Sequence, residues 1–245
     1  LFFIKDNIPD DCLDDYSLIM PCIGVGNVSQ LACDLIISSL NMKKIASVYH
    51  PAIIPVAGYN PFDLKSNSPC TSCEVYKSDT KKILVMQLRS SLIYQDAEEF
   101  LQDVVNTFKT RNIKEVIILT SCFAYEKKRI STSSFRYMAN KLCGHKEQAK
   151  SLNWEEHDSS DGDLWTLGGG EASVMYDACE EMSMPCLMLY KYCSEGDNIP
   201  DAYELLQHLN GVFPIFDPEP DIKSQLIQPV SWDLLFGGPP PQEIY

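Results

Sequence analysis

The sequence predicts a three-layer α/β/α sandwich built around a mostly parallel sheet. Two observations lead to this fold class. Runs such as EVIILTS (115–121) and CLMLYKY (186–192) are apolar at consecutive positions, as expected for strands that are buried on both faces. Amphipathic stretches with helical spacing alternate with these runs along the chain. We expect a single domain over residues 1–236 and an extended tail over residues 237–245.

The first part of the chain is expected to form a strand, a glycine turn, a helix and a second strand. The apolar run SLIMPC (17–22) precedes the turn Gly24-Val-Gly26-Asn27. Apolar residues then recur at helical spacing from Val28 to about Asn41. Residues 45–49 are typical of the next strand, which predicts a parallel pair with the first strand through a right-handed crossover.

A hairpin and a helix are predicted next. Pro55 makes residues 53–57 an edge strand or an irregular segment, because proline has no N–H to donate to a sheet. Residues 74–77 and 82–89 are separated by four turn-forming residues, which favours an antiparallel hairpin. From Asp96, apolar residues follow one face of a predicted helix.

The second half of the chain mixes irregular and regular segments. Residues 122–165 are charged and are expected to be irregular. A helix around 175–182 and the buried strand at 186–192 follow. The stretch SEGDNIPDAYELLQHLNG (194–211) has a capping Asp or Asn, a first-turn proline and a terminal glycine, and therefore predicts another helix. Residues 212–231 are Pro-rich and are predicted to be extended.

Composition argues against several classes of function. No run reaches the roughly 18 apolar residues that a membrane span needs, and the start LFFIKDNIPDD is no secretory signal. The net charge of −14 argues against nucleic acid as the main partner. Ten cysteines with a lone CxxC (Cys70, Cys73) and scattered histidines predict reduced thiols and no metal site, as in a cytosolic or nuclear protein.

Charge is distributed unevenly between two neighbouring segments. Residues 127–150 contain seven basic residues and one acid, whereas EEHDSSDGD (155–163) is strongly acidic. One interpretation is a long, solvent-exposed segment outside the regular elements of the fold. The other is a surface that meets a charged partner.

Three turns beyond strand ends carry candidate catalytic residues. Gly24-Val-Gly26-Asn27 departs from a dinucleotide-binding fingerprint, since Ser29 stands where the third glycine belongs. Gly168-Gly-Gly170 precedes a helix but lacks the Lys-Ser/Thr of a P-loop. Glu195 and Asp197 offer two carboxylates, although Asp197 fits a helix cap equally well. No GxSxG motif or Cys–His or Ser–His pair accompanies them, which favours a protein that is not an enzyme.

Four stretches, in order along the chain, resemble the proteasome assembly chaperone 2 family. They are GVGNVSQLACDLIISSLNM (24–42), SLNWEE (151–156), SEGDNIPDA (194–202) and SWDLLFG (231–237). The resemblance implies an α/β/α fold similar to that of nucleoside phosphorylases and hydrolases, without their known chemistry and without a cofactor.

The resemblance also implies partners and a place in the cell. It predicts a chaperone that forms a heterodimer with proteasome assembly chaperone 1 and binds the outer face of the 20S proteasome α-ring. There it would promote α-ring assembly and prevent off-pathway association, in the cytoplasm and nucleus. The alternative is a phosphorylase-like enzyme for a small molecule, with a pocket formed by Gly24, Gly26, Asn27, Glu195 and Asp197.

The end of the chain, WDLLFGGPPPQEIY (232–245), is assigned a role by the same resemblance. In this family and in proteasome activators, a hydrophobic–Tyr–X tail inserts between α-subunits. Ile244 and Tyr245 match the first two positions, and the position X is absent from the sequence. Gly237 and Gly238 are the expected joint of the tail, and the prolines hold it extended. The last apolar residues before the joint are expected to pack in the domain: Trp232, Leu234, Leu235 and Phe236.

Overall fold

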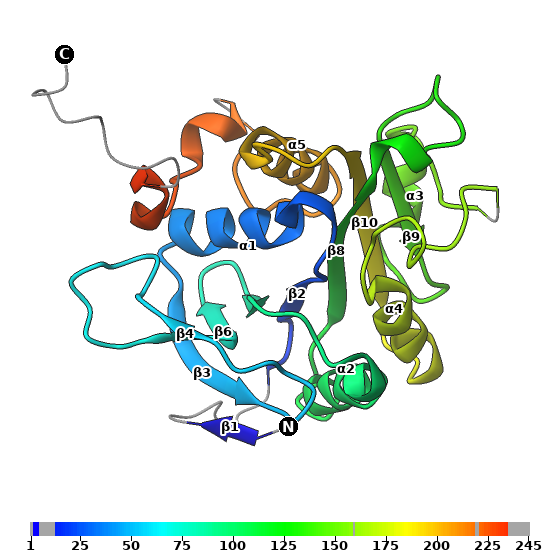
Figure 1. Cartoon of the computed structure of the whole chain (residues 1–245). Coiled ribbons are helices and arrows are strands. Elements are labelled where there is room, and N and C mark those ends of the chain that lie inside the picture. Colours follow the sequence, from blue (N-terminus) through cyan, green and yellow to red (C-terminus); the bar gives the residue numbers. More distant parts are fainter. Residues whose placement is uncertain (1, 5–12, 159, 219–220, 235–245) are drawn as a thin grey trace, which may run out of the picture.

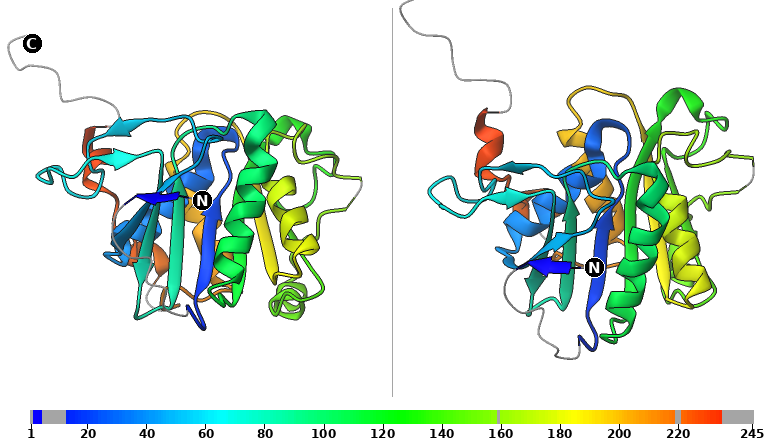
Figure 2. Two further views of the ribbon diagram at one scale, coloured as in Figure 1. Left: turned by 90° about the horizontal axis from the view of Figure 1, so that it is seen from below. Right: turned by 60° about the horizontal axis from the view of Figure 1, so that its bottom comes forward.

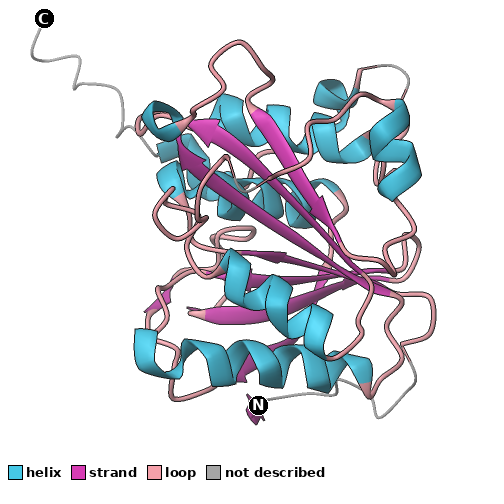
Figure 3. Cartoon of the chain, turned by 90° about the vertical axis from the view of Figure 1, so that its right-hand side faces the viewer, coloured by secondary structure: helices cyan, strands magenta, loops and turns pink. Residues whose placement is uncertain are grey.

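A mixed eight-stranded sheet forms the centre of the molecule, with helices on both faces (Figures 1 and 3). The computed structural model describes residues 2–4, 13–158, 160–218 and 221–234. The strand order is β1-β3-β6-β7-β2-β8-β10-β9. Their bounds are β1 Phe2–Ile4, β2 Ser17–Pro21, β3 Lys43–Tyr49, β6 Cys73–Ser78, β7 Ile83–Leu88, β8 Glu115–Phe123, β9 Phe135–Ala139 and β10 Cys186–Cys193. A separate two-stranded sheet pairs β4 (Ala57–Gly58) with β5 (Cys70–Thr71).

Four adjacent strands in the middle of the sheet, β7, β2, β8 and β10, are parallel. The strands on either side pair antiparallel: β6 with β7, β3 with β6, β1 with β3, and β9 with β10. The predicted α/β fold is therefore confirmed, with its parallel part in the centre of the sheet.

Two helices cover each face of the sheet. Helices α1 (Val28–Ser39) and α5 (Ile199–Asn210) lie on one face, and α2 (Tyr94–Lys109) and α4 (Ala172–Glu181) lie on the other (Figure 1). Within β2, Leu18 and Met20 belong to the core beneath α2 and α4, whereas Ile19 belongs to the core beneath α1 and α5. Because successive strand residues point to opposite faces and both faces are covered, the strand is apolar at consecutive positions after Ser17.

The shorter elements complete the chain. Helix α3 covers Lys146–Ser151. Four single 3₁₀ turns, η1 to η4, cover Val25–Asn27, Ala124–Glu126, Ile222–Gln225 and Val230–Leu234. The predicted hairpin, the four longer helices and the strands at 17–22, 115–121 and 186–192 are all present, so these predictions are confirmed.

The predicted parallel pairing of β2, before the glycine turn, with β3, after α1, is wrong. β3 runs in the same direction as β2, but β6 and β7 lie between them. The hairpin occupies the position beside β2, since β7 pairs with β2 in the register Ser17↔Ile83. The connection through α1 therefore passes over the hairpin before the chain enters β3.

The expectation that residues 122–165 are irregular is also wrong, because they contain β9 and α3. β9 is short, pairs with a single strand and carries the buried Arg136, which interrupts its apolar pattern. α3 is a six-residue helix of mostly polar residues. Similarly, the predicted extended segment 212–231 contains the turn η3 and the start of η4.

The end of the described chain packs against the domain. Trp232 is buried, 8% exposed, in the core beneath α1 and α5, as predicted. The side chain of Leu234, together with Leu235, Phe236, Gly237, Gly238, Ile244 and Tyr245, lies outside what the structure describes. The tail and its joint therefore stay predictions.

Candidate functional site

The carboxyl ends of β2, β3, β7, β8 and β10 lie at one edge of the sheet, which we call the carboxyl edge (Figure 2). In open α/β sheets, this edge is where ligands bind. The loops that form it are residues 22–27, 50–59, 89–93, 124–134 and 194–198. The segment before α4 joins them, since Phe123 N donates to Leu167 O at the end of β8.

An open hollow of about 440 Å³ lies at the centre of the carboxyl edge. Its lining includes four of the five residues of the predicted enzyme pocket: Gly24, Gly26, Asn27 and Glu195. The fifth, Asp197, is not part of this lining. Its Oδ1 accepts a hydrogen bond from Ile199 N at 3.2 Å, at the start of α5. The structure therefore brings the predicted glycine turn and the predicted acidic loop together, but places Asp197 at a helix start.

Close packing explains the two glycines of this hollow. A Cβ on Gly24 would lie 2.5 Å from Ser121 O. Gly26 has a φ of 64°, and a Cβ on it would lie 2.3 Å from Asn198 Oδ1. The Asn198 side chain in turn fixes its own loop, through hydrogen bonds with Gly196 N, Ser194 O and Asp201 Oδ2. The glycines thus let the turn after β2 lie directly against the loop after β10.

The hollow offers few groups that could perform chemistry. Among the described residues that line it, Glu195 is the single ionisable side chain. General acid–base catalysis needs a positioned group within reach of the reacting proton, and anion binding needs cations or convergent N–H donors. Close packing therefore accounts for the glycines of this turn, and the described lining of the hollow offers one carboxylate.

Large apolar side chains are exposed around the same edge. They extend from its loops and from the neighbouring ends of β3, α2 and the segment before α4. The set consists of Tyr49, Ile54, Val56, Tyr59, Ile93, Tyr94, Tyr125, Ile130 and Trp165. Two of its members form a ring contact, Tyr94 with Trp165 at 5.4 Å between centroids. Exposed apolar side chains that gather on one part of a surface are typical of protein–protein or ligand contact sites.

Sequence reasoning missed this apolar surface. The sequence pattern predicts a strand at Tyr49 and an edge strand or irregular segment at Val56, and it predicts no role for Tyr94 and Trp165. A signal was present in HPAIIPVAGYNPF (50–62), where three prolines keep an apolar stretch out of the regular sheet. Apolar residues that cannot enter a sheet ladder are candidates for an exposed contact surface.

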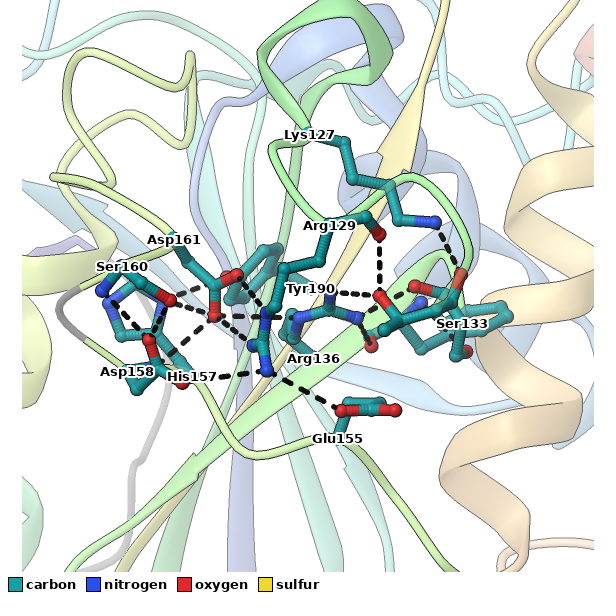
Figure 4. A network of polar contacts seen from close by, with 12 residues as sticks. Lys127, Arg129, Ser133, Arg136, Glu155, His157, Asp158, Ser160, Asp161 and Tyr190 are labelled. Carbon is teal, nitrogen blue, oxygen red and sulfur yellow. Dashed lines mark hydrogen bonds and ion pairs between the residues drawn. The ribbon is translucent and has the colours of Figure 1, made fainter.

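The basic and acidic segments of the charged region pair with each other (Figure 4). Arg129 donates to both carboxylate oxygens of Asp161, at 3.2 and 2.7 Å, and lies 3.5 Å from Asp158 and 3.8 Å from Glu155. Nε of the fully buried Arg136 lies 3.5 Å from Asp161 Oδ2, the oxygen that accepts the shorter hydrogen bond from Arg129. The two segments therefore form ion pairs with each other around the buried Asp161, and most of the other paired side chains are partly exposed.

Burial and pairing act in opposite directions on Asp161. Burial alone raises the pKa of this carboxyl group, but the hydrogen bond from Arg129 and the charge of Arg136 outweigh it. The pKa of Asp161 is held below its usual value, so the group is ionised at neutral pH. In the same network, His157 Nδ1 lies 2.8 Å from Tyr190 Oη, and burial lowers the pKa of His157.

The cysteines are buried, free and poorly reactive among the described residues. In the lone CxxC, burial raises the pKa of Cys70 to about 11 and the pKa of Cys73 still further. Within the described ranges, no group of three or more His, Cys, Asp or Glu side chains could hold a metal ion. No helix in the same ranges is long and apolar enough to cross a membrane.

Comparison with protein families and curated sequences gives consistent matches. The model of the PAC2 family matches residues 18–220. Proteasome assembly chaperone 2 of Xenopus tropicalis is 33% identical over 260 residues, which cover 99% of this chain and 100% of the relative. The human protein of the same name is 35% identical over 257 residues, with 96% and 97% of the two chains covered.

Solved structures show the same fold at low sequence identity. Pyrococcus furiosus PbaA, described as an archaeal homolog of proteasome-assembly chaperone, has a TM-score of 0.64 and 17% identity, with 86% of this chain and 87% of PbaA covered. Pyrococcus furiosus PbaB, described as an archaeal proteasome activator, has a TM-score of 0.63 and 15% identity, with 91% and 92% covered.

Proposed function

Because the chain belongs to the PAC2 family, we propose that it is a non-catalytic proteasome assembly chaperone. The observation that carries this proposal is the extent of the similarity, which covers 99% of the chain and the whole of a relative named for that role. The carboxyl edge supports it. The hollow at the ligand position of the fold holds one carboxylate, while exposed apolar side chains surround it.

The proposed partners are proteasome assembly chaperone 1 and the α-subunits of the 20S proteasome. The chain forms a heterodimer with the first and binds the outer face of the α-ring, where it promotes ring assembly and prevents off-pathway association. Ile244 and Tyr245 insert between α-subunits, with Gly237 and Gly238 as the joint of the tail. The proposed location is the cytoplasm and nucleus.

Co-expression and affinity capture test this function. The tagged chain is expressed in a eukaryotic cell, and the captured proteins are identified by mass spectrometry. We expect proteasome assembly chaperone 1, called the sister chaperone below, and α-subunits among the captured proteins. β-subunits should be depleted relative to a capture of mature proteasomes. Capture of the chain alone, at expression levels where the sister chaperone is present, would overturn the proposal.

A small-molecule enzyme is the second candidate, because the glycine turn and Glu195 do share one hollow. Purified chain is assayed for phosphorolysis and hydrolysis of purine and pyrimidine nucleosides, beside the variant Glu195→Gln. The chaperone proposal predicts no turnover by either protein. Turnover that disappears in Glu195→Gln would instead establish an enzyme with its site in the hollow.

A further inference from the structure

A second cavity at the carboxyl edge is an apolar groove of about 540 Å³. It lies between the end of β3, the loop after it and the end of β5. The lining is mostly apolar and includes Val48, Tyr49, Ile53, Pro55 and Val56. The volume is sufficient for one or two large apolar side chains from another molecule.

The wall of this groove is held rigidly by hydrogen bonds. Ile54 O accepts from the hydroxyls of Ser72 and Ser90, both at 2.7 Å, and Val56 N donates to Ser72 Oγ at 2.6 Å. Ile93 N donates to Ala52 O at 2.7 Å. The backbone is thus fixed while the side chains of Ile54 and Val56 stay exposed. A preorganised apolar wall loses little conformational entropy on binding, as is usual for energetically important contact residues.

The groove continues toward the place where the described chain ends. Val56 also lines a smaller hollow of about 150 Å³, together with Tyr59 and Pro61. Pro61 O accepts a hydrogen bond from Ser231 N at 3.2 Å, in the final turn η4. The groove, Tyr59 and the last described turn therefore form one continuous stretch of surface.

The length of chain beyond this turn limits where the tail can bind. Eleven residues, 235–245, follow Leu234. At roughly 3.1 Å per residue, an extended Pro-rich segment of this length reaches about 34 Å. A pocket that receives Ile244 and Tyr245 can therefore lie no farther than about 34 Å from the end of η4, and Pro61 with the groove beside it lies within that reach.

We propose that this groove, lined by Tyr49 and Val56 and continued by the neighbouring hollow at Tyr59, binds the same proteasome α-ring that receives the tail. This inference rests on the proposed function and specifies its surface. The groove takes one or two large apolar side chains from the outer face of the ring. Two linked contacts bind more tightly than either alone, because attachment of the first raises the effective concentration of the second.

Affinity for the purified 20S proteasome, measured on the heterodimer with the sister chaperone, tests the inference. The variants are Val56→Asp, Tyr59→Ser and a deletion of residues 237–245. Val56 and Tyr59 are 54% and 87% exposed, so neither substitution is expected to change the melting temperature. The matched control is Leu142→Asp, which is 54% exposed beyond the opposite end of the sheet.

We expect Val56→Asp to weaken ring binding at least tenfold, and Tyr59→Ser to weaken it several-fold. Leu142→Asp should leave it unchanged. The double change, Val56→Asp with the tail deletion, should be weaker than either single change. Ring binding that is lost with the tail but unchanged in both groove variants would overturn the groove assignment and leave the proposed function intact.

Two further outcomes would also overturn the assignment. If Val56→Asp prevents heterodimer formation while the assembled heterodimer binds the ring normally, the groove belongs to the sister chaperone. If the unmodified heterodimer does not bind the ring at all, the proposed function fails and the groove assignment fails with it.

Discussion

At the scale of single residues, the environment of a side chain decides its role more than its type does. His208 is stacked between Trp154 and Phe135, with ring centroids 4.0 and 4.1 Å away. Burial lowers the pKa of His208 to about 4. By contrast, tyrosines occur both in the core, as Tyr190, and on the surface, as Tyr59. The exposed apolar surface could not be predicted from residue type alone.

The half-buried His208 predicts that stability falls as the pH falls from about 6.5 to 4. In this window the unfolded chain binds a proton on His208 and the folded chain does not, so acid favours unfolding. The free energy of unfolding should decrease by up to about 2 kcal/mol from this residue between pH 7 and pH 5. Urea unfolding at both pH values measures the difference, which should be smaller in His208→Phe. An unchanged difference in that variant would contradict the assignment.

Asp161 predicts a large loss of stability when its charge is removed. Asp161→Asn leaves the buried Arg136 without its carboxylate neighbour, and breaking a buried ion pair costs about 3–5 kcal/mol. Glu147→Gln removes a surface carboxylate bound to Lys150 and should change stability by less than about 1 kcal/mol. Urea unfolding at pH 7 compares the two variants. Equal small effects would mean that the network is not stabilising.

At the scale of elements, local patterns predicted most segments but not all of their positions. The β6–β7 hairpin and α5 are evident from turn and cap residues that lie close together in sequence. The position of β3 depends on the pairing of β7 with β2, which connects residues far apart in the chain. β9 was not predicted because Arg136, a charged residue, occupies a buried position in the strand. The burial of this charge is compensated by its ion pair with Asp161, which is distant in sequence.

The turn between β2 and α1 predicts a strong dependence on Gly26. Gly26→Ala places a Cβ against Asn198 and puts alanine at a φ of 64°, so we expect at least about 1–2 kcal/mol of destabilisation. Gly58→Ala is the control, since nothing lies within 4 Å of the added Cβ. Thermal melting distinguishes them. A Gly26→Ala protein as stable as the control would show that this turn does not need glycine.

At the scale of the whole molecule, the fold is an α/β sheet with helices on both faces, and its carboxyl edge combines an open hollow with exposed apolar side chains. The glycine turn and the acidic loop were correctly predicted to share this edge, because parallel strands bring the residues after them together. The groove beside them depends on how the loop at 50–57 is held by Ser72 and Ser90, which no local pattern reveals.

The boundary between domain and tail predicts that stability depends on Trp232 and does not depend on residues 237–245. Trp232→Ala removes a side chain buried beneath α1 and α5 and should destabilise the protein by about 3–5 kcal/mol. Deletion of residues 237–245 should leave the melting temperature unchanged, because the last described buried anchor is kept. Calorimetry of both proteins checks this, and a large drop on tail deletion would place the tail in the packed domain.

Site-specific photocrosslinking tests most directly whether the carboxyl edge contacts the α-ring. A photoreactive phenylalanine replaces Tyr59 in one protein and Leu142 in another, and each is assembled with the sister chaperone and purified 20S proteasome. We predict crosslinks to α-subunits from position 59 and none from position 142. Crosslinks to α-subunits from position 142 alone, or no α-subunit crosslink from either position, would contradict the account.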